Sequence, residues 1–171
     1  NQPMSYGHIH LICNGELFNY RDLYQQYRDK YKFQSKSDCE VIIPMFLEKG
    51  PGKTARELDA EFVFVIYDSA MDKYFAARDP VGIRPMFYGY TEEGSIMFAS
   101  EMKALHNLCK HVKPFPPGHY YDGKRFISFR DISAVSEYTE DSTEEIFRNI
   151  NHLLTRAVEK RLQSDVPVGF L

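Results

Sequence analysis

The stretch Cys13-Asn14-Gly15-Glu16-Leu17-Phe18-Asn19-Tyr20 separates two segments of different character. The residues before it, His8–Cys13, form a short run rich in apolar and β-branched side chains, which is typical of a strand. The residues after it, Tyr20–Lys30, have a helix-like pattern. The sequence therefore predicts a strand that stops at Cys13, a helix that begins at Tyr20, and a connection that opens with Asn14 and Gly15.

Asn14 and Gly15 place two neutral hydrogen-bond donors side by side, a carboxamide and a backbone N–H that no side chain shields. Two such donors aimed at one oxygen stabilise the negative charge that develops there during amide hydrolysis, and removing one typically lowers the rate by about 10²–10³. Asn-Gly is also a very common turn dipeptide, because both residues tolerate positive φ. On this dipeptide alone, a plain turn is the simpler interpretation.

A second polar element, Ser37-Asp38-Cys39-Glu40, opens a helical pattern that continues to Lys49. Ser37 and Glu40 have the spacing of a capping box, in which each side chain bonds an amide at the start of the helix. Asp38 can complement the helix dipole, worth about 0.3–1 kcal/mol, or pair with an ammonium group. Together with Asn14 it supplies the two halves of an amino-acid site, one for the α-ammonium end and one for the amide oxygen.

Seven stretches that run in order along nearly the whole chain resemble the glutaminase domain of glutamine-hydrolysing asparagine synthetase, a class II glutamine amidotransferase. They are Asn14–Glu16 with Tyr20, Ser37–Glu40, Glu61–Asp68, Arg78–Pro85, Ala99–Leu105, Phe115–Tyr120 and Ser164–Leu171. No single stretch is specific, but the ordered set is. The resemblance implies an α+β fold, the αββα sandwich of N-terminal-nucleophile type, here incomplete.

The resemblance also implies the chemistry and its residues. In this family a cysteine thiolate at the amino terminus of the mature chain attacks the glutamine side-chain amide, with its own α-amine as base. Mapped onto this sequence, Asn14 and Gly15 would be the oxyanion donors. Glu16 and Asp38 would position glutamine together with them, with Asp38 on the ammonium group. Leu171 would touch adenine.

A second domain of the family uses ATP and Mg²⁺ to convert aspartate into β-aspartyl-AMP, from which ammonia displaces AMP. The partners implied are therefore the small molecules glutamine, aspartate and ATP, and a homodimer is compatible with the resemblance. The compartment implied is the cytoplasm. We expect this chain itself to bind no cofactor and no metal ion.

Two parts of the family pattern have no match here. The sequence lacks the amino-terminal cysteine with the downstream segment whose arginine holds the substrate carboxylate, since it opens with Asn1–Met4. It also stops at Leu171, where the family continues into a Ser-Gly-Gly-Leu-Asp-Ser pyrophosphate loop. We therefore expect an internal fragment of a longer enzyme, inactive by itself.

The order of the expected elements favours α+β, because successive antiparallel strands follow a group of helices. Besides the elements already named, we expect a short helix at Gly52–Asp59 and a kink or late start where Pro44 removes a backbone donor.

A boundary divides residues 1–130, the glutaminase part, from residues 131–171, a linker and the start of the synthetase domain. There, a capping box at Ser142 and Glu145 opens a long helix with one buried face, and residues 166–171 begin a buried strand. The remaining expected strands are Glu61–Tyr67, Lys73–Ala77, Met86–Tyr90, Ser95–Phe98 and Phe126–Arg130.

Composition excludes several classes of function. The formal net charge of −3 gives no basic footprint, so nucleic acid and anionic membranes are not expected partners. The three cysteines, Cys13, Cys39 and Cys109, are widely spaced, which suits a reducing compartment and simple packing. The six histidines show no metal-ligand spacing tied to a carboxylate. The turn that holds Arg78, Asp79 and Arg84 is interpreted as an ion-paired structural turn.

Three alternatives stay open at this point. One is another class II amidotransferase, such as the glutamine phosphoribosylpyrophosphate enzyme, and a second is a β-lactam-synthetase-like relative without the catalytic cysteine. A third, of a different class, is a non-catalytic ligand-binding domain of the same fold. Glu16 after Asn-Gly, and Asp165-Val166-Pro167 near the end, favour the synthetase.

Overall fold

The structure is a computed structural model that describes residues 2–162, 167 and 169. The chain divides into two compact units, Asn1–Ile132 and Ser133–Leu171, which are described separately. This division lies two residues from the boundary expected from the sequence. The assignment of the units to glutaminase and synthetase domains stays a prediction.

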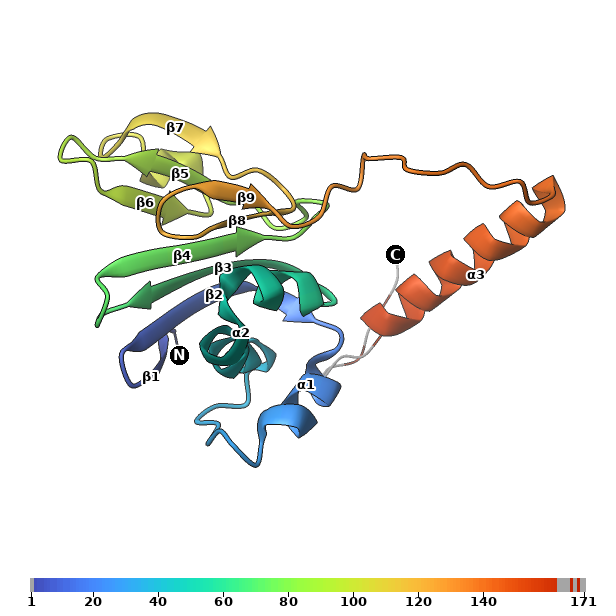
Figure 1. The fold of residues 1–171 in the computed structure, drawn as a ribbon, viewed down its shortest axis with the longest axis horizontal. Helices are drawn as coiled ribbons and strands as arrows, with labels where there is room; N and C mark the ends of the chain where they lie inside the picture. Colours follow the sequence, from blue (N-terminus) through green and yellow to red (C-terminus); the bar gives the residue numbers. More distant parts are fainter. Residues whose placement is uncertain (1, 163–166, 168, 170–171) are drawn as a thin grey trace. The chain divides into compact units, whose positions relative to one another are not determined.

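Two antiparallel sheets form the centre of the first unit (Figure 1). The larger sheet has six strands in the order β1-β2-β3-β4-β8-β9, and the smaller has three in the order β6-β5-β7. The strands of the larger sheet are β1 (Met4–Tyr6), β2 (Ile9–Leu17), β3 (Ala60–Asp68), β4 (Lys73–Arg78), β8 (His119–Tyr121) and β9 (Phe126–Ser128). Those of the smaller sheet are β5 (Phe87–Tyr90), β6 (Ile96–Ala99) and β7 (Lys110–Pro114).

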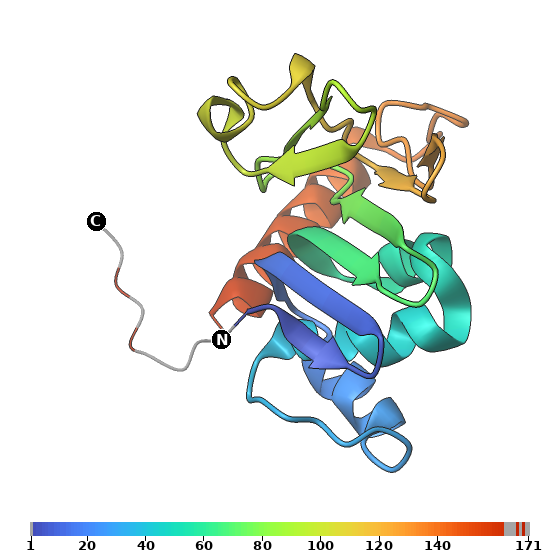
Figure 2. The ribbon, with the colours of Figure 1, turned by 90° about the vertical axis from the view of Figure 1, so that its left-hand side faces the viewer.

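Helices cover one face of the larger sheet, and the smaller sheet covers part of the other. The helices are α1 (Tyr20–Tyr27), the 3₁₀ helix η1 (Asp38–Val41) and α2 (Ile42–Glu57), and Figures 1 and 2 both show α2 along the same face of the sheet. A further 3₁₀ helix, η2, spans Met102–Ala104. The expected mixed α+β fold is confirmed as a helix–sheet–sheet arrangement.

Alternation along β3 explains why its sequence is almost continuously apolar. Phe62, Phe64 and Ile66 belong to the core beneath the helices. Val63 is buried in the second core, between the sheets, and Val65 packs against that core. Successive strand side chains point to opposite faces, so a central strand buried on both faces needs apolar residues at nearly every position.

The two helices expected at Asp38–Lys49 and Gly52–Asp59 form a single bent element. η1 leads directly into α2, so Pro44 lies in the first turn of the α-helix, where its missing N–H costs no intrahelical hydrogen bond. The bend comes at Gly50, whose φ of 73° only glycine adopts readily, and Pro51 follows it. The expected late start is confirmed, and the kink lies six residues after Pro44.

Several expected boundaries are wrong in informative ways. β1 and β7 were not expected, because both are short and β7 carries two lysines; β8 begins at His119, the strand start that the turn at Pro116–Gly118 indicates. The helix expected at Tyr20–Lys30 ends at Tyr27. The Ser37–Glu40 capping box is wrong: Ser37 makes no side-chain cap, and the Glu40 carboxylate turns inward instead.

The second unit contains one long helix, α3 (Thr143–Arg161). Its expected capping box is confirmed, since Ser142 Oγ accepts from Glu145 N–H while the Glu145 carboxylate accepts from Ser142 N–H. The expected buried face is wrong within the described residues, because apolar side chains such as Phe147, Leu153 and Leu154 are exposed. The strand expected over residues 166–171 lies largely outside the described residues.

Candidate active site

The Asn14-Gly15-Glu16 segment lies within strand β2 and not in a connection after it. β2 continues to Leu17, and the three residues pair with Val63, Phe62 and Glu61 of β3. The expectation of a strand that stops at Cys13 is therefore wrong. The Asn-Gly dipeptide, which usually favours a turn, is held extended here by nine consecutive residue pairs between β2 and β3.

Gly15 is required because the strands approach too closely for any side chain. A Cβ at this position would lie 2.6 Å from the Glu61 carbonyl oxygen and 2.9 Å from the Phe62 Cα. Both contacts are with backbone or near-backbone atoms that cannot move aside. Glycine is thus fixed by packing, and its N–H remains unshielded as the sequence suggested.

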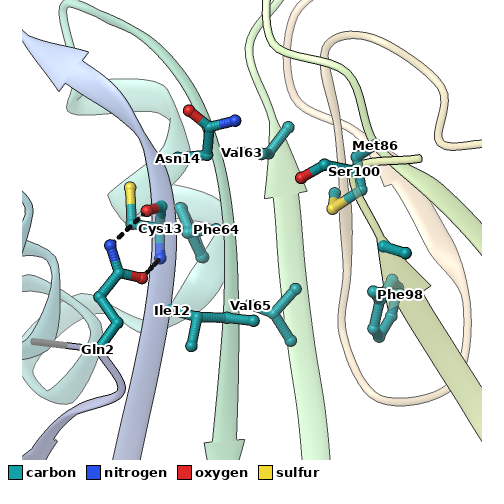
Figure 3. A pocket seen from close by; sticks show the side chains of 11 residues that line it. Gln2, Ile12, Cys13, Asn14, Val63, Phe64, Val65, Met86, Phe98 and Ser100 are labelled. Carbon is teal, nitrogen blue, oxygen red and sulfur yellow. Dashed lines mark hydrogen bonds between the residues drawn. The ribbon is translucent and has the colours of Figure 1, made fainter. Parts of the chain in front are cut away.

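The edge of β2 that faces β1 is only partly covered. The β1–β2 ladder ends at the Met4–Leu11 pair. Beyond it, the Cys13 N–H donates to Gln2 Oε1 and the Gln2 Nε2 donates to the Cys13 carbonyl, both at 2.7 Å (Figure 3). Further along the same edge of β2, the Leu17 N–H donates to Asp38 Oδ2 at 2.8 Å.

Gly15 lies midway between these two anchored residues. Backbone N–H groups alternate between the two edges of an antiparallel strand, so Cys13, Gly15 and Leu17 all direct theirs to the same edge. No element of β1 reaches Gly15. Its carbonyl oxygen lies 3.9 Å from the Cys39 Sγ, which donates a weak hydrogen bond to it. The Gly15 N–H therefore points to a short stretch of sheet edge where it has no hydrogen-bond partner among the described residues.

The Asn14 side chain lies on the face of the sheet that the helices leave free. It is exposed and lines a cavity of about 180 Å³ (Figure 3). The other walls come from Gln2 just before β1, from β2 and β3, from Met86 just before β5, and from the end of β6, which includes Phe98. Gly15, Glu16 and Asp38 do not line this cavity. The cavity holds one half of the expected site, and the edge of β2 holds the other.

Asp38 is placed by the loop that precedes it. The Glu40 side chain is buried, and its two carboxylate oxygens accept hydrogen bonds from Gln34 N–H, Ser35 N–H and Ser35 Oγ. A carboxylate that receives several backbone N–H groups is a strong anchor for a loop. Glu40 thus fixes the segment leading into η1. Asp38 Oδ1 makes no hydrogen bond within the described part of the chain.

Glu16 lies directly opposite Glu61 across the β2–β3 pair. Two carboxylates at such positions repel each other unless a cation intervenes. Arg84 supplies this cation, because its guanidinium Nη2 lies 2.7 Å from Glu61 Oε1. Its buried Nε has no hydrogen-bond partner among the described residues. Arg84 therefore brings positive charge to the strand pair that carries Glu16.

The turn that presents Arg84 is a structural turn, as expected, but hydrogen bonds to the backbone hold it and not the expected ion pairs between Asp79 and the two arginines. Asp79 is buried, and its carboxylate accepts the N–H groups of the four residues 81–84. The Arg78 guanidinium donates to the carbonyls of Gly82, Arg84 and Phe115. Burial lowers the pKa of the Arg78 guanidinium, and the nearby Asp79 charge opposes that shift.

The cysteines are free and packed. Cys13 and Cys39 are buried, and Cys109 is partly exposed. A hydrogen bond with Cys39, followed by burial, raises the pKa of the Cys13 thiol well above its usual value. Such a thiol is a poor nucleophile at neutral pH, because the thiolate is the reactive form.

The remaining expectations concern adenine, metals and membranes. Leu171, expected near adenine, lies outside the described residues. Within residues 2–162 and the two described positions after them, no group of three or more His, Cys, Asp and Glu side chains could hold a metal ion. No helix in the same part of the chain is both long and apolar enough to span a membrane.

Gln2, at the edge of the site, was missed, since nothing in the sequence marks its side chain as a partner of Cys13.

A family model described as "Glutamine amidotransferase domain" matches residues 1–155. This chain belongs to the glutamine amidotransferase family. The match covers all of the first unit and most of α3, so the family assignment includes every site residue that the structure describes.

Curated relatives of this amidotransferase chain carry a consistent name. It is 41% identical to "Asparagine synthetase B [glutamine-hydrolyzing]" of Escherichia coli, with 94% of this chain and 29% of that protein covered. It is 38% identical to "Probable asparagine synthetase [glutamine-hydrolyzing]" of Acanthamoeba polyphaga mimivirus, with 94% and 33% covered. It is also 38% identical to "Asparagine synthetase [glutamine-hydrolyzing] 1" of Saccharomyces cerevisiae, with 99% and 30% covered. The chain thus spans about a third of the length of these relatives.

Solved structures support the fold of this amidotransferase. A glutamine phosphoribosylpyrophosphate amidotransferase from B. subtilis, complexed with ADP and GMP, matches 76% of this chain and 31% of its own, with a TM-score of 0.61 and 23% identity. A structure titled the allosteric regulatory enzyme of purine biosynthesis matches 75% of this chain and 31% of its own, with a TM-score of 0.62 and 24% identity. At these identities the likeness concerns the fold alone, which is the expected N-terminal-nucleophile type.

Proposed function

We propose that this chain is the glutamine-binding part of an asparagine synthetase that hydrolyses glutamine and passes the ammonia to an ATP-dependent amidation of aspartate. The observation that carries the proposal is the edge of β2 at Gly15, whose N–H has no hydrogen-bond partner among the described residues. There the Gly15 N–H lies between Cys13, held by Gln2, and Leu17, held by Asp38. The relatives named as glutamine-hydrolysing asparagine synthetases favour this enzyme over other amidotransferases.

In the proposed site, the Gly15 N–H and the Asn14 carboxamide donate to the amide oxygen of glutamine as it gains negative charge. Donors fixed in advance need no rearrangement during the reaction, which makes them effective. Asp38 binds the α-ammonium group through Oδ1, since Oδ2 already accepts from Leu17. Glu16 lies one residue beyond Gly15 and helps to position the same end of the substrate.

The attacking thiolate of the family has no counterpart among the three cysteines of this chain. Cys13 and Cys39 are buried, and the raised pKa of Cys13 disfavours its thiolate. We therefore propose that residues 1–171 alone release no ammonia from glutamine. The nucleophile and the Mg·ATP site would belong to other parts of the parent enzyme. We also propose a cytoplasmic location and small-molecule partners, and a homodimer is compatible with this proposal.

The test uses the full-length protein. Purified enzyme is supplied with L-glutamine, and ammonia and glutamate are measured with and without aspartate and Mg·ATP. We expect glutamine hydrolysis, and asparagine when all substrates are present. Ammonia without asparagine would support a different class II amidotransferase. Saturable glutamine binding without turnover would support a non-catalytic domain.

A matched pair of variants assigns the activity to this site. Asn14→Ala is expected to lower kcat for glutamine hydrolysis by about 10²–10³, the usual effect of losing one oxyanion donor. Asn149→Ala, on the exposed surface of α3, serves as the control and should leave kcat for glutamine hydrolysis unchanged. Equal activity of the two variants would contradict the assignment of Asn14.

A further inference from the structure

We propose that Gln2 is a positioning residue for the oxyanion donors: its side-chain carboxamide takes the place of a strand residue opposite Cys13 and fixes the backbone from which Asn14 and Gly15 extend. The inference rests on the proposed function and adds a residue to its site. Gln2 does not touch the expected position of the substrate oxygen, so its effect would pass through β2.

The register of the sheet shows what Gln2 replaces. Met4 pairs with Leu11, Ser5 with His10 and Tyr6 with Ile9. Continued by two residues, this register places residue 2 opposite Cys13. β1 begins only at Met4, so the backbone ladder stops before this position.

The Gln2 side chain makes the two bonds that a backbone would make there. Its Oε1 accepts from the Cys13 N–H and its Nε2 donates to the Cys13 carbonyl, both at 2.7 Å (Figure 3). A carboxamide carries the same donor and acceptor as a peptide group, so it can complete a ladder pair. Both bonds are shorter than the usual N–H···O distance of about 2.9–3.0 Å.

The position of this pair links it to the donors. The Cys13 carbonyl belongs to the same peptide group as the Asn14 N–H, so holding the carbonyl fixes the plane from which Asn14 begins. Asp38 holds Leu17 at the other end. Gly15 is thus the single residue on this edge between two side-chain anchors. Without Gln2, only the anchor at Leu17 would remain.

A merely structural role and a positioning role predict different kinetics. We compare Gln2→Met, which keeps most of the volume and removes both hydrogen bonds, with Ser5→Ala as the control. Ser5 makes the other side-chain tie between β1 and β2, a 2.9 Å contact between its Oγ and His10 Nδ1. Both variants therefore loosen the same strand pair, but only Gln2→Met does so beside Asn14.

In the full-length enzyme, Gln2→Met is expected to lower kcat for glutamine hydrolysis by about 10-fold or more, since displacements near 1 Å can cost about 10² in rate. KM for glutamine should change less than about twofold, because Asp38 keeps its place. Ammonia-dependent asparagine synthesis should be unchanged, as should both activities of Ser5→Ala. An unchanged kcat, or a parallel loss of both activities, would overturn the inference.

A second variant provides a rescue. Ionised Gln2→Glu accepts from the Cys13 N–H but cannot donate to the Cys13 carbonyl, whereas its protonated form can do both. The kcat of Gln2→Glu relative to the wild type should therefore rise as pH falls toward the carboxyl pKa, ordinarily about 4.3 and raised by the facing carbonyl. A pH-independent ratio would contradict the donor role of Nε2.

Amide hydrogen exchange separates this inference from the proposed function. Exchange at Cys13, whose N–H donates to Gln2 Oε1, should be faster in Gln2→Met than in Ser5→Ala, whether or not the protein hydrolyses glutamine. If the wild type has no glutaminase activity, the proposed function fails and the exchange result still decides the structural role of Gln2. Equal exchange in the two variants would rule that role out.

Discussion

Asp38 Oδ2 accepts a 2.8 Å hydrogen bond from the backbone N–H of Leu17, which places a carboxylate from the helix layer at the edge of the strand that carries Asn14 and Gly15. The two residues are 21 positions apart in the sequence. This bond brings Asp38 to the edge of β2 near Gly15, whereas the Asn14 side chain lines a cavity that Asp38 does not reach.

Asp38→Asn separates the structural from the ligand-binding role of this carboxylate. The amide oxygen can still accept from Leu17, so the free energy of unfolding should change little. The negative charge for the glutamine ammonium is lost, so KM for glutamine should rise by about 10-fold or more, consistent with about 1.5–3 kcal/mol for a hydrogen bond to a charged group. Steady-state kinetics and urea unfolding measure the two effects. A stability loss without a change in KM would assign Asp38 to the fold alone.

Gly15→Ala should be destabilising because its Cβ would lie 2.6 Å from a carbonyl oxygen of β3. Forced overpacking of this kind typically costs about 1–3 kcal/mol, and the displaced strand should also lose glutaminase activity. Gly7→Ala is the comparison, since Gly7 has a φ of 57° but open space around it. If urea unfolding showed equal stability for Gly15→Ala and the wild type, the close approach of β2 and β3 would be in doubt.

Glu40→Gln tests the anchor of the loop before Asp38. A carboxamide would face three donors with one acceptor oxygen and its own N–H₂ group, so at least one donor would lose its partner. We expect a loss of about 1–3 kcal/mol in the free energy of unfolding and a weaker affinity for glutamine. Glu48→Gln, at an exposed position of α2, should change neither. Identical thermal unfolding of the two variants would argue against the buried anchor.

Thiol labelling tests the environment of the cysteines. At pH 8 the raised pKa of Cys13 keeps it protonated, and burial shields both Cys13 and Cys39. A thiol reagent should therefore label Cys109 first, and Cys109→Ser should remove the fast phase. Three thiols should react after denaturation. Fast labelling of Cys39 in the native protein would show an accessible thiolate and reopen the question of its role.

Much of the first unit could be predicted from local patterns. β3 and β4 follow from apolar and aromatic runs with clear turns between them, and η1 and α2 from the helical spacing after Asp38. The strands that were missed are short or charged, and they form through pairing partners that are distant in sequence. Local propensity carries little information about such strands.

The candidate site shows the same division. The residue types of Asn14, Gly15 and Asp38 suggested roles for them, but the strand that contains Asn14 and Gly15 was predicted to stop too early. The Asn-Gly dipeptide favours a turn locally, and the long pairing with β3 overrides it. The inward turn of Glu40 and the bonds of Gln2 could not be predicted, because each depends on a backbone position that only the folded chain defines.

The hydrogen bonds of Gln2 have a practical consequence for anyone who shortens this protein. A version that begins after Pro3 would retain all of β2 and the loop to Asp38, and conventional criteria for choosing an expression boundary would accept it. It would nevertheless leave the Cys13 amide and carbonyl facing water. Local instability of β2 in such a truncated version would then reflect a missing side chain more than ten residues upstream, and not a defect in β2 itself.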